Sequence, residues 1–154
     1  MSIHFPDWVS PALALARQTL ESCHAPDSFD FIGQIDETLP REGYRMQLSP
    51  MESGKQTLRL SGGSDVGLMY GAMDFVNRII PAAEQAHKWM FPYYFVNPFE
   101  TGFAPMDETS SPSVARRGLW TWGHVIYDYR GYLTNMARLK LNELVIWNDF
   151  APLN

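Results

Sequence analysis

The sequence predicts an α+β fold: a small antiparallel sheet with helices packed on one face, followed by a partial βαβ unit. Three observations support this prediction. Two stretches of alternating apolar and polar residues, 43–48 and 56–60, flank a short turn-rich link. Two other segments repeat apolar residues at helical spacing. The residues from 111 onward then read as strand, helix and strand.

The composition is that of a folded globular protein and excludes several classes of function. The chain has 154 residues, of which 45% are apolar and 19% charged, with a net charge of −5. Lysine and arginine are scattered, so no nucleic-acid partner is expected. The apolar runs are far shorter than the ~20 residues of a membrane span. The N-terminus lacks a signal pattern, which favours a cytoplasmic location. If a signal has been removed, the protein is periplasmic or secreted.

The cysteine and histidine content gives no indication of a metal or cofactor. Cys23 is the single cysteine, so an internal disulfide is excluded, and its position at a helix end is more typical of a packed residue than of a reactive thiol. The four histidines show no spacing typical of metal ligands: His4, His24, His87 and His124. The sequence therefore predicts no metal and no cofactor.

The N-terminal half contains a helix, a strand and a hairpin. Ser10 and Pro11 are typical of an N-cap and first helical position, which predicts a helix over 11–23 that ends before Pro26. The segment 29–35 is apolar and β-prone. The predicted strands 43–48 and 56–60 are joined by a short link, so we expect an antiparallel hairpin.

A second helix is predicted from Ser64 and Asp65 as far as Pro81. Gly67 and Gly71 lie within it, and each glycine costs about 1 kcal/mol against alanine in a helix interior. The expected reason is a close approach of the helix to the sheet.

The segment 82–113 is rich in proline and aromatic residues, which predicts an irregular connector with one short strand near 93–96. The composition changes at 106–112, and this stretch is interpreted as a linker. The predicted domains are 1–110, an accessory α+β domain, and 111–154, a strand–helix–strand unit.

In the last segment we expect a strand over 115–120, a helix over 129–140 with Asn142 as its C-cap, and a strand over 143–147. Parallel strands need helices on both faces, and so small a unit does not supply them. We therefore expect further chain beyond Asn154, or self-association through the unpaired strands.

Aromatic and polar residues gather where the two strands of this last segment end. In barrels of alternating strands and helices, binding groups lie at the carboxyl ends of the strands. Aromatic rings beside hydrogen-bonding groups suit a sugar, and Trp120 suits sugar contact and a place in the apolar core equally well. The candidate sugar-binding residues at these ends are Trp122, His124, Tyr127, Trp147, Asn148 and Asp149.

The sequence also resembles a known family in two places. GYRMQL followed by GKQTLRLSGGSDVGLMYGAMDFVNRI resembles the small α+β domain before the barrel of family 20 glycoside hydrolases, the β-N-acetylhexosaminidases. RRGL followed by NMARLKLNELVIWND resembles the start of that family's (β/α)₈ barrel. Similar N-terminal domains precede α-glucuronidase barrels. The resemblance covers about 29–80 and 115–149.

The resemblance implies a carbohydrate substrate and one further sugar contact. In the hexosaminidases an arginine before glycine on the first barrel strand binds hydroxyls of the sugar, and here that position is Arg117. An ion pair at the barrel mouth is the alternative role for Arg117. The chain departs from the family at Trp122, which stands in place of an aspartate, and at Val125 and Ile126, which stand in place of Arg-His. A sugar other than an N-acetylhexosamine is therefore open.

Family 20 enzymes act with an Asp-Glu pair on the fourth barrel strand, and glycoside hydrolysis generally needs two flanking carboxylates. Neither Asp107–Glu108, in the linker, nor Asp36–Glu37, in a loop, is expected to fill that role. The sequence thus predicts the non-catalytic N-terminal portion of a glycoside hydrolase, with no catalytic residues of its own. The alternative is a stand-alone carbohydrate-binding or interaction module.

Overall fold

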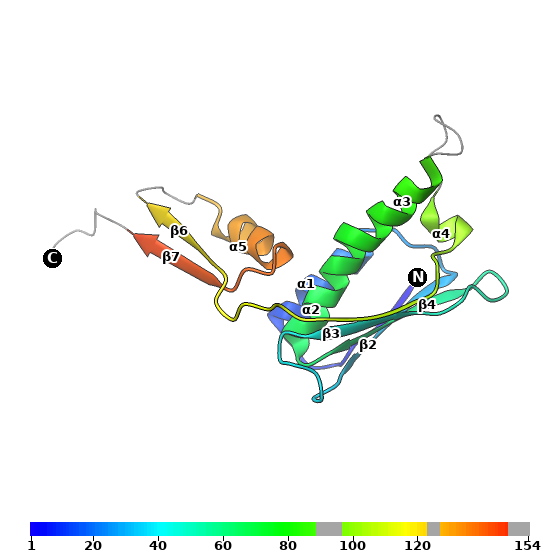
Figure 1. Cartoon of the computed structure of the whole chain (residues 1–154), viewed down its shortest axis with the longest axis horizontal. Coiled ribbons are helices and arrows are strands. Elements are labelled where there is room, and N and C mark those ends of the chain that lie inside the picture. Colours follow the sequence, from blue (N-terminus) through cyan, green and yellow to red (C-terminus); the bar gives the residue numbers. More distant parts are fainter. Residues whose placement is uncertain (89–96, 123–126, 148–154) are drawn as a thin grey trace. The chain divides into compact units, whose positions relative to one another are not determined.

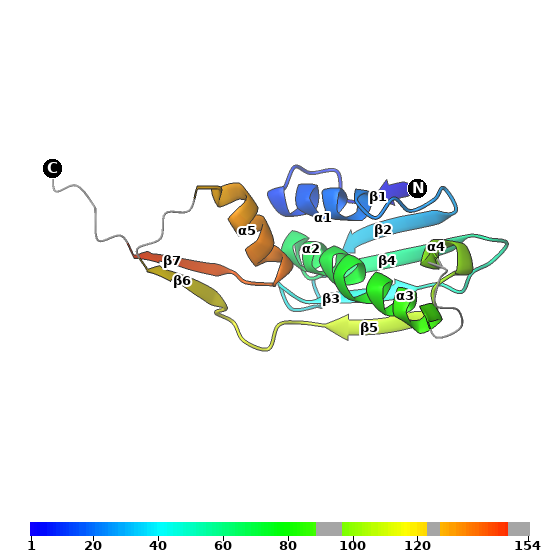
Figure 2. The same ribbon diagram turned by 90° about the horizontal axis from the view of Figure 1, so that it is seen from above.

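The computed structural model describes residues 1–88, 97–122 and 127–147. The chain divides into two compact units, Met1–Ser111 and Pro112–Asn154. The first unit holds a five-stranded sheet, and its helices lie over one face of that sheet (Figures 1 and 2). The second holds a two-stranded parallel sheet and one helix, and no barrel closes within the described residues.

The sheet of the first unit is mixed, which corrects the prediction of an antiparallel sheet. Its strands are β1 (Ser2–His4), β2 (Phe29–Ile35), β3 (Tyr44–Leu48), β4 (Gln56–Gly62) and β5 (Met106–Ser110). They lie in the order β1-β2-β4-β3-β5. β1, β2 and β4 are mutually parallel, whereas β3 is antiparallel to both β4 and β5. The predicted hairpin of β3 and β4 is confirmed, with Met46 opposite Leu60.

The two edge strands were not predicted from the sequence. β1 has only three residues, too few for an alternating pattern to be recognised. β5 was interpreted as a linker because its residues, MDETS, are mostly polar. An edge strand tolerates polar residues, because one of its sides has no strand partner. Pairing with β3 places Asp107 opposite Gln47.

Helix α1 (Pro11–Glu21) begins as predicted, with the Ser10 side chain accepting a hydrogen bond from the Ala12 amide at 3.2 Å. It ends two residues earlier than expected. α1 packs against α2 (Asp65–Asp74), whose N-cap is Ser64. The apolar side of α1 is buried through Leu13, Ala16 and Leu20.

The second helix does not stop at Pro81, contrary to the prediction. α2 passes into a π-helical turn, η1 (Phe75–Ile79), and continues as α3 (Ile80–Lys88). The amide of Ile80 donates to the Phe75 carbonyl, a bond one residue longer than the α-helical one. A proline inside an α-helix lacks a donor and collides with a carbonyl of the preceding turn. The π turn lies immediately before Pro81, and both features are known sites of kinks within a continuing helix.

The expected close approach of α2 to the sheet is confirmed at both glycines. A Cβ on Gly67 would lie 2.3 Å from the Gly43 carbonyl oxygen. A Cβ on Gly71 would lie 3.2 Å from the Tyr44 ring and 3.3 Å from a methyl of Leu60. α2 therefore rests directly on β3 and β4, and Gly67 is the position where no side chain fits.

The core between sheet and helices is largely aromatic. Neighbouring phenylalanine rings in it have centroids 5.0–6.0 Å apart, in tilted and edge-to-face arrangements. Two of these rings come from the region predicted to be an irregular connector, which contains the short helix α4 (Pro98–Thr101). The predicted strand near 93–96 lies outside the described residues. The cluster consists of Phe29, Phe31, Phe75, Phe99 and Phe103.

In the second unit, β6 (Gly118–Trp122) and β7 (Glu143–Trp147) pair in parallel, and helix α5 (Tyr129–Arg138) lies between them along the chain. The β7 boundaries are those predicted, and the parallel pairing is confirmed. β6 begins three residues later than expected, at Gly118, and ends two residues later, at Trp122. No helix in the described part of the chain is long and apolar enough to cross a bilayer.

Candidate functional site

The backbone of the second unit brings the two predicted strand ends together. In the parallel register Trp122 lies opposite Trp147, each the last residue of its strand. His124, Asn148 and Asp149 lie outside the described residues. The register therefore places two of the predicted sugar-binding positions side by side at the carboxyl ends of β6 and β7.

Two described aromatic side chains of this unit are mostly exposed to solvent. Trp120 is 62% exposed on β6, and Tyr127, which precedes α5, is 95% exposed. The apolar side chains of β7 are also open, with Val145 at 40% and Ile146 at 47%. The unit thus presents apolar and aromatic surface that a ligand or further protein can cover.

Arg117 lies at the amino end of β6, where it joins the start of the strand to the loop after α5. Its Nε donates to the Lys140 carbonyl at 2.6 Å, and its Nη1 donates to the Val114 carbonyl. Lys140 lies just after the end of α5 and has a left-handed backbone with φ of 57°. The sugar contact assigned to Arg117 by resemblance stays a prediction.

Asn142 does not cap α5, whose C-cap is Leu139, and instead closes the amino ends of the two strands. Its Oδ1 accepts from the Arg117 amide at 3.0 Å, and its Nδ2 donates to the Ala115 carbonyl at 2.8 Å. Arg116 forms an ion pair with Glu143 beside it. The hydrogen bond from Arg116 lowers the pKa of the Glu143 carboxyl, which favours its ionised form. The ion pair joins the residue before β6 to the first residue of β7.

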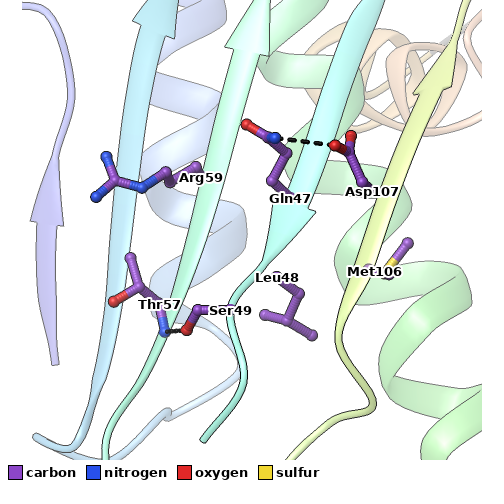
Figure 3. A pocket seen from close by; sticks show the side chains of 7 residues that line it. All are labelled: Gln47, Leu48, Ser49, Thr57, Arg59, Met106 and Asp107. Atoms are coloured by element: carbon purple, nitrogen blue, oxygen red, sulfur yellow. Dashed lines mark hydrogen bonds between the residues drawn. The ribbon is translucent and has the colours of Figure 1, made fainter. Parts of the chain in front are cut away.

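A shallow depression lies on the open face of the first unit's sheet (Figure 3). It has a volume of about 290 Å³ and crosses β3, β4 and β5. Figure 3 shows Gln47 and Asp107 joined by a hydrogen bond, while the Arg59 side chain points away from both. The lining residues are Gln47, Leu48, Ser49, Thr57, Arg59, Met106 and Asp107.

Asp107 is the most strongly perturbed acid in the described residues, but its partners are structural. Its two carboxylate oxygens accept from the Arg45 fork at 2.7 and 2.6 Å, and Gln47 donates at 3.0 Å. The hydrogen bonds from Arg45 lower the pKa of Asp107 to about 2. Glu108, the next residue, pairs with Arg78 at 2.8 Å. Both carboxylates of this pair are held by arginines, and the pKa of Asp107 is lowered, whereas a general acid needs a raised pKa.

Two further observations limit the chemistry of the described residues. Burial raises the pKa of the Cys23 thiol to about 11, and its Sγ donates to the Leu20 carbonyl, which is the environment of an unreactive thiol. Among residues 1–88, 97–122 and 127–147, no three His, Cys, Asp or Glu side chains converge as metal ligands.

A second pocket was not foreseen from the sequence. It has a volume of about 470 Å³ and is lined by Trp8, Ile35, Glu37, Gly63, Ser64 and Asp65. The pocket forms near the ends of β1, β2 and β4. Trp8 could not be recognised as part of it from the sequence, because β1 was not predicted.

Comparison with known proteins gives the fold. No protein-family model and no curated protein sequence matches the chain. The structure is similar to a family 20 exo-β-N-acetylglucosaminidase from Vibrio harveyi, with a TM-score of 0.61 and 16% identity over 94% of this chain. It is also similar to a family 138 enzyme that targets pectin rhamnogalacturonan II, with a TM-score of 0.56 and 18% identity over 96% of this chain. The chain spans about a fifth of the length of each, 21% and 18%. It therefore has the fold of one part of a glycoside hydrolase.

Proposed function

We propose that this chain is the N-terminal, non-catalytic portion of a glycoside hydrolase that acts on O-glycosyl bonds. The observation that carries the proposal is the order of its two units. A mixed sheet with helices on one face is followed by a parallel β6-α5-β7 segment, and both lie within the similarity to glycoside hydrolase chains. In this role the first unit supports a barrel, and β6 begins it.

The sugar contacts of the proposed barrel come from the carboxyl ends of β6 and β7. The paired positions Trp122 and Trp147 lie there, with Tyr127 following β6 along the chain. Barrel enzymes carry their binding and catalytic groups at this end of the strands. Arg117 adds a guanidinium, whose planar fork suits two neighbouring hydroxyls. To bind them, its Nε would have to give up its hydrogen bond to the Lys140 carbonyl.

The acid and the nucleophile of such an enzyme are expected outside the residues described here. Asp107 and Glu108 are bound to arginines. Asp36 accepts hydrogen bonds from the amide and hydroxyl of Thr38, which lower its pKa instead of raising it. A glycosidase needs one carboxylic acid of raised pKa opposite a second carboxylate.

The decisive experiment is to read the gene beyond the codon for Asn154 and to assay its product. A further ~200 residues of alternating strands and helices are enough to complete a barrel. The proposal expects a paired carboxylate in that region and glycosidase activity on a panel of aryl glycosides. The 154-residue chain serves as the inactive control. A longer product without a carboxylate pair in its barrel would exclude the hydrolase role.

A stand-alone carbohydrate-binding module is the second candidate, favoured by the exposed ring of Trp120 and the aligned positions of Trp122 and Trp147. Titration of the chain with mono- and oligosaccharides, followed by tryptophan fluorescence, tests it. Saturable quenching that Trp120→Ala abolishes would support this role. An unchanged spectrum with every sugar would exclude it.

Self-association is proposed for the isolated chain, because β6 and β7 form a sheet of only two strands and each has one edge that no described strand covers. Such edges pair with other chains. Sedimentation velocity between 10⁻⁶ and about 10⁻⁴ M, a range that brackets micromolar affinities, is expected to show a concentration-dependent dimer. A monomer throughout would contradict it.

A further inference from the structure

The second pocket of the first unit lies where three parallel strands end. β1, β2 and β4 run side by side in the same direction (Figure 2). The chain leaving β1 carries Trp8, the chain leaving β2 carries Glu37, and the chain leaving β4 carries Gly63, Ser64 and Asp65. Ligands of open sheets with parallel strands commonly bind in the crevice outside the carboxyl ends of the strands. The pocket therefore occupies a position typical of a binding site.

The connection that carries Trp8 is anchored on both sides. Before it, Phe5 packs on Gly33, where a Cβ would come within 2.4 Å of the ring. Arg17 lies 5.4 Å from the centroid of the same ring and donates to the Phe5 carbonyl at 3.3 Å. After it, the Ser10 hydroxyl donates to the Asp65 carboxylate. Trp8 nevertheless remains 54% exposed, so a large ring faces solvent from a fixed backbone.

The loop that carries Glu37 is fixed against the glycines that follow β4. A Cβ on Gly63 would lie 2.0 Å from the Pro40 carbonyl oxygen, and the Ser64 hydroxyl donates to the Arg41 carbonyl at 2.6 Å. The carboxylate of Glu37 has no hydrogen-bond partner among the described residues. Asp65 accepts from Ser10 and from the Val66 amide, which leaves part of its acceptor capacity open.

We propose that this pocket binds a neutral sugar residue, stacked on Trp8 and hydrogen-bonded through its hydroxyls to the carboxylates of Glu37 and Asp65. The indole ring offers an apolar face for the C–H surface of a sugar, and ionised carboxylates accept hydrogen bonds from hydroxyl groups. The pocket has a volume of about 470 Å³ and is wide open to solvent. No lysine or arginine lines the pocket. The carboxylate of a uronic acid would be repelled by those of Glu37 and Asp65, so the pocket disfavours such a sugar.

This site is separate from the sugar contacts proposed for β6 and β7, and it does not depend on whether a longer protein hydrolyses glycosides. All six of its lining residues belong to the first unit. It gives that unit a ligand of its own in addition to its supporting role.

The test is isothermal titration calorimetry of the 154-residue chain with methyl glucoside, methyl galactoside, N-acetylglucosamine and glucuronate. At least one neutral sugar is expected to bind, and glucuronate is expected to bind at least about tenfold more weakly. Trp8→Ala and Glu37→Gln are each expected to weaken the neutral sugar by about tenfold, whereas Trp8→Phe retains most of the affinity. Glu52→Gln, which removes an exposed carboxylate on the hairpin, is the matched control and leaves the affinity unchanged.

A second measurement locates the bound sugar on the parent chain. In ¹H–¹⁵N spectra, the neutral sugar is expected to shift the amide signals of Ile35, Gly63 and Asp65. Binding that survives Trp8→Ala and Glu37→Gln but disappears in Trp120→Ala would place the sugar on the second unit, which overturns this inference and supports the binding-module role. Absence of heat and of shifts with every neutral sugar at millimolar concentration also overturns it.

Discussion

The side chain of Gln56 pairs with both backbone polar atoms of Phe103. Its Oε1 accepts from the Phe103 amide at 3.0 Å, and its Nε2 donates to the Phe103 carbonyl at 2.8 Å. The same Nε2 donates to the Ser49 carbonyl at 2.8 Å, and Gln56 is only 2% exposed. One buried amide thus takes the place of a strand partner and fixes the segment that brings Phe103 into the aromatic core.

Replacing Gln56 by leucine is expected to destabilise the first unit by about 2–4 kcal/mol, because the amide and carbonyl of Phe103 lose their partners while buried. Urea denaturation of the chain measures this. Gln18→Leu, at an exposed position on α1, is the control and is expected to change the free energy of unfolding by less than about 0.5 kcal/mol. Equal effects of the two substitutions would contradict the role of Gln56.

Gly67→Ala is expected to destabilise the protein by about 1–3 kcal/mol, although alanine is the better helix former. The added methyl would lie 2.3 Å from the Gly43 carbonyl oxygen, which belongs to the backbone and cannot turn aside. Gly71→Ala is the matched control, because its nearest neighbours are side-chain atoms at 3.2–3.3 Å that can shift. Thermal unfolding of both variants is expected to rank Gly67→Ala as the less stable.

The ion pair of Arg45 and Asp107 predicts a specific dependence of stability on acid. The pKa of Asp107 is about 2 in the folded chain, below the value of about 3.9 of an unfolded aspartate. A carboxylate with a lowered pKa stabilises the fold above its unfolded pKa, and this contribution is lost as the pH falls through the folded pKa. The loss therefore falls between about pH 4 and pH 2.

Asp107→Asn is expected to flatten the decrease in stability over that interval, measured as unfolding midpoints against pH. The carboxyl carbon of Asp107 in the parent chain is expected to titrate near the lower end of the interval in NMR spectra. Asp7→Asn, for which the structure gives no hydrogen-bond partner among the described residues, is the control and leaves the profile unchanged. A titration of Asp107 at the ordinary aspartate value would refute the ion pair.

The Cys23 thiol is expected to alkylate slowly in the native protein. With a pKa of about 11, its thiolate fraction at pH 8 is roughly a hundredfold lower than that of a thiol of ordinary pKa. Iodoacetamide labelling followed by mass spectrometry compares the native chain with the chain in urea. Equal labelling rates would show that burial does not protect the thiol.

Arg117 can be tested for its structural and its sugar-binding role at once. Arg117→Ala and Asn142→Ala both open the amino ends of β6 and β7, because each removes a hydrogen bond across them. Faster amide exchange in the second unit is expected for both. If a longer gene product hydrolyses glycosides, as proposed, only Arg117→Ala is expected to weaken its sugar binding, measured as a rise in KM. Similar values of KM for the two variants would limit Arg117 to structure.

The sequence by itself determined the elements whose periodicity is strong and local. Residues close together in the chain were enough to predict the boundaries of β2 and β7, the caps at Ser10 and Ser64, and the hairpin of β3 and β4. The close approach of α2 followed from two glycines that helix propensity alone does not explain. The candidate sugar positions followed from the rule that binding groups lie at the ends of parallel strands, and the structure describes the side chains of only some of them.

Only the tertiary structure decided the features that depend on partners distant in sequence. β1 and β5 are strands because β2 and β3 offer them hydrogen bonds, and their own residues carry too weak a pattern to show it. The sheet is mixed because α1 carries the chain from β1 back to a parallel neighbour, which no local pattern specifies. The helix continues past Pro81, and a π turn precedes that proline. The pocket of Trp8 and Glu37 exists because three strands end at one edge, and strand order is a property of the whole unit.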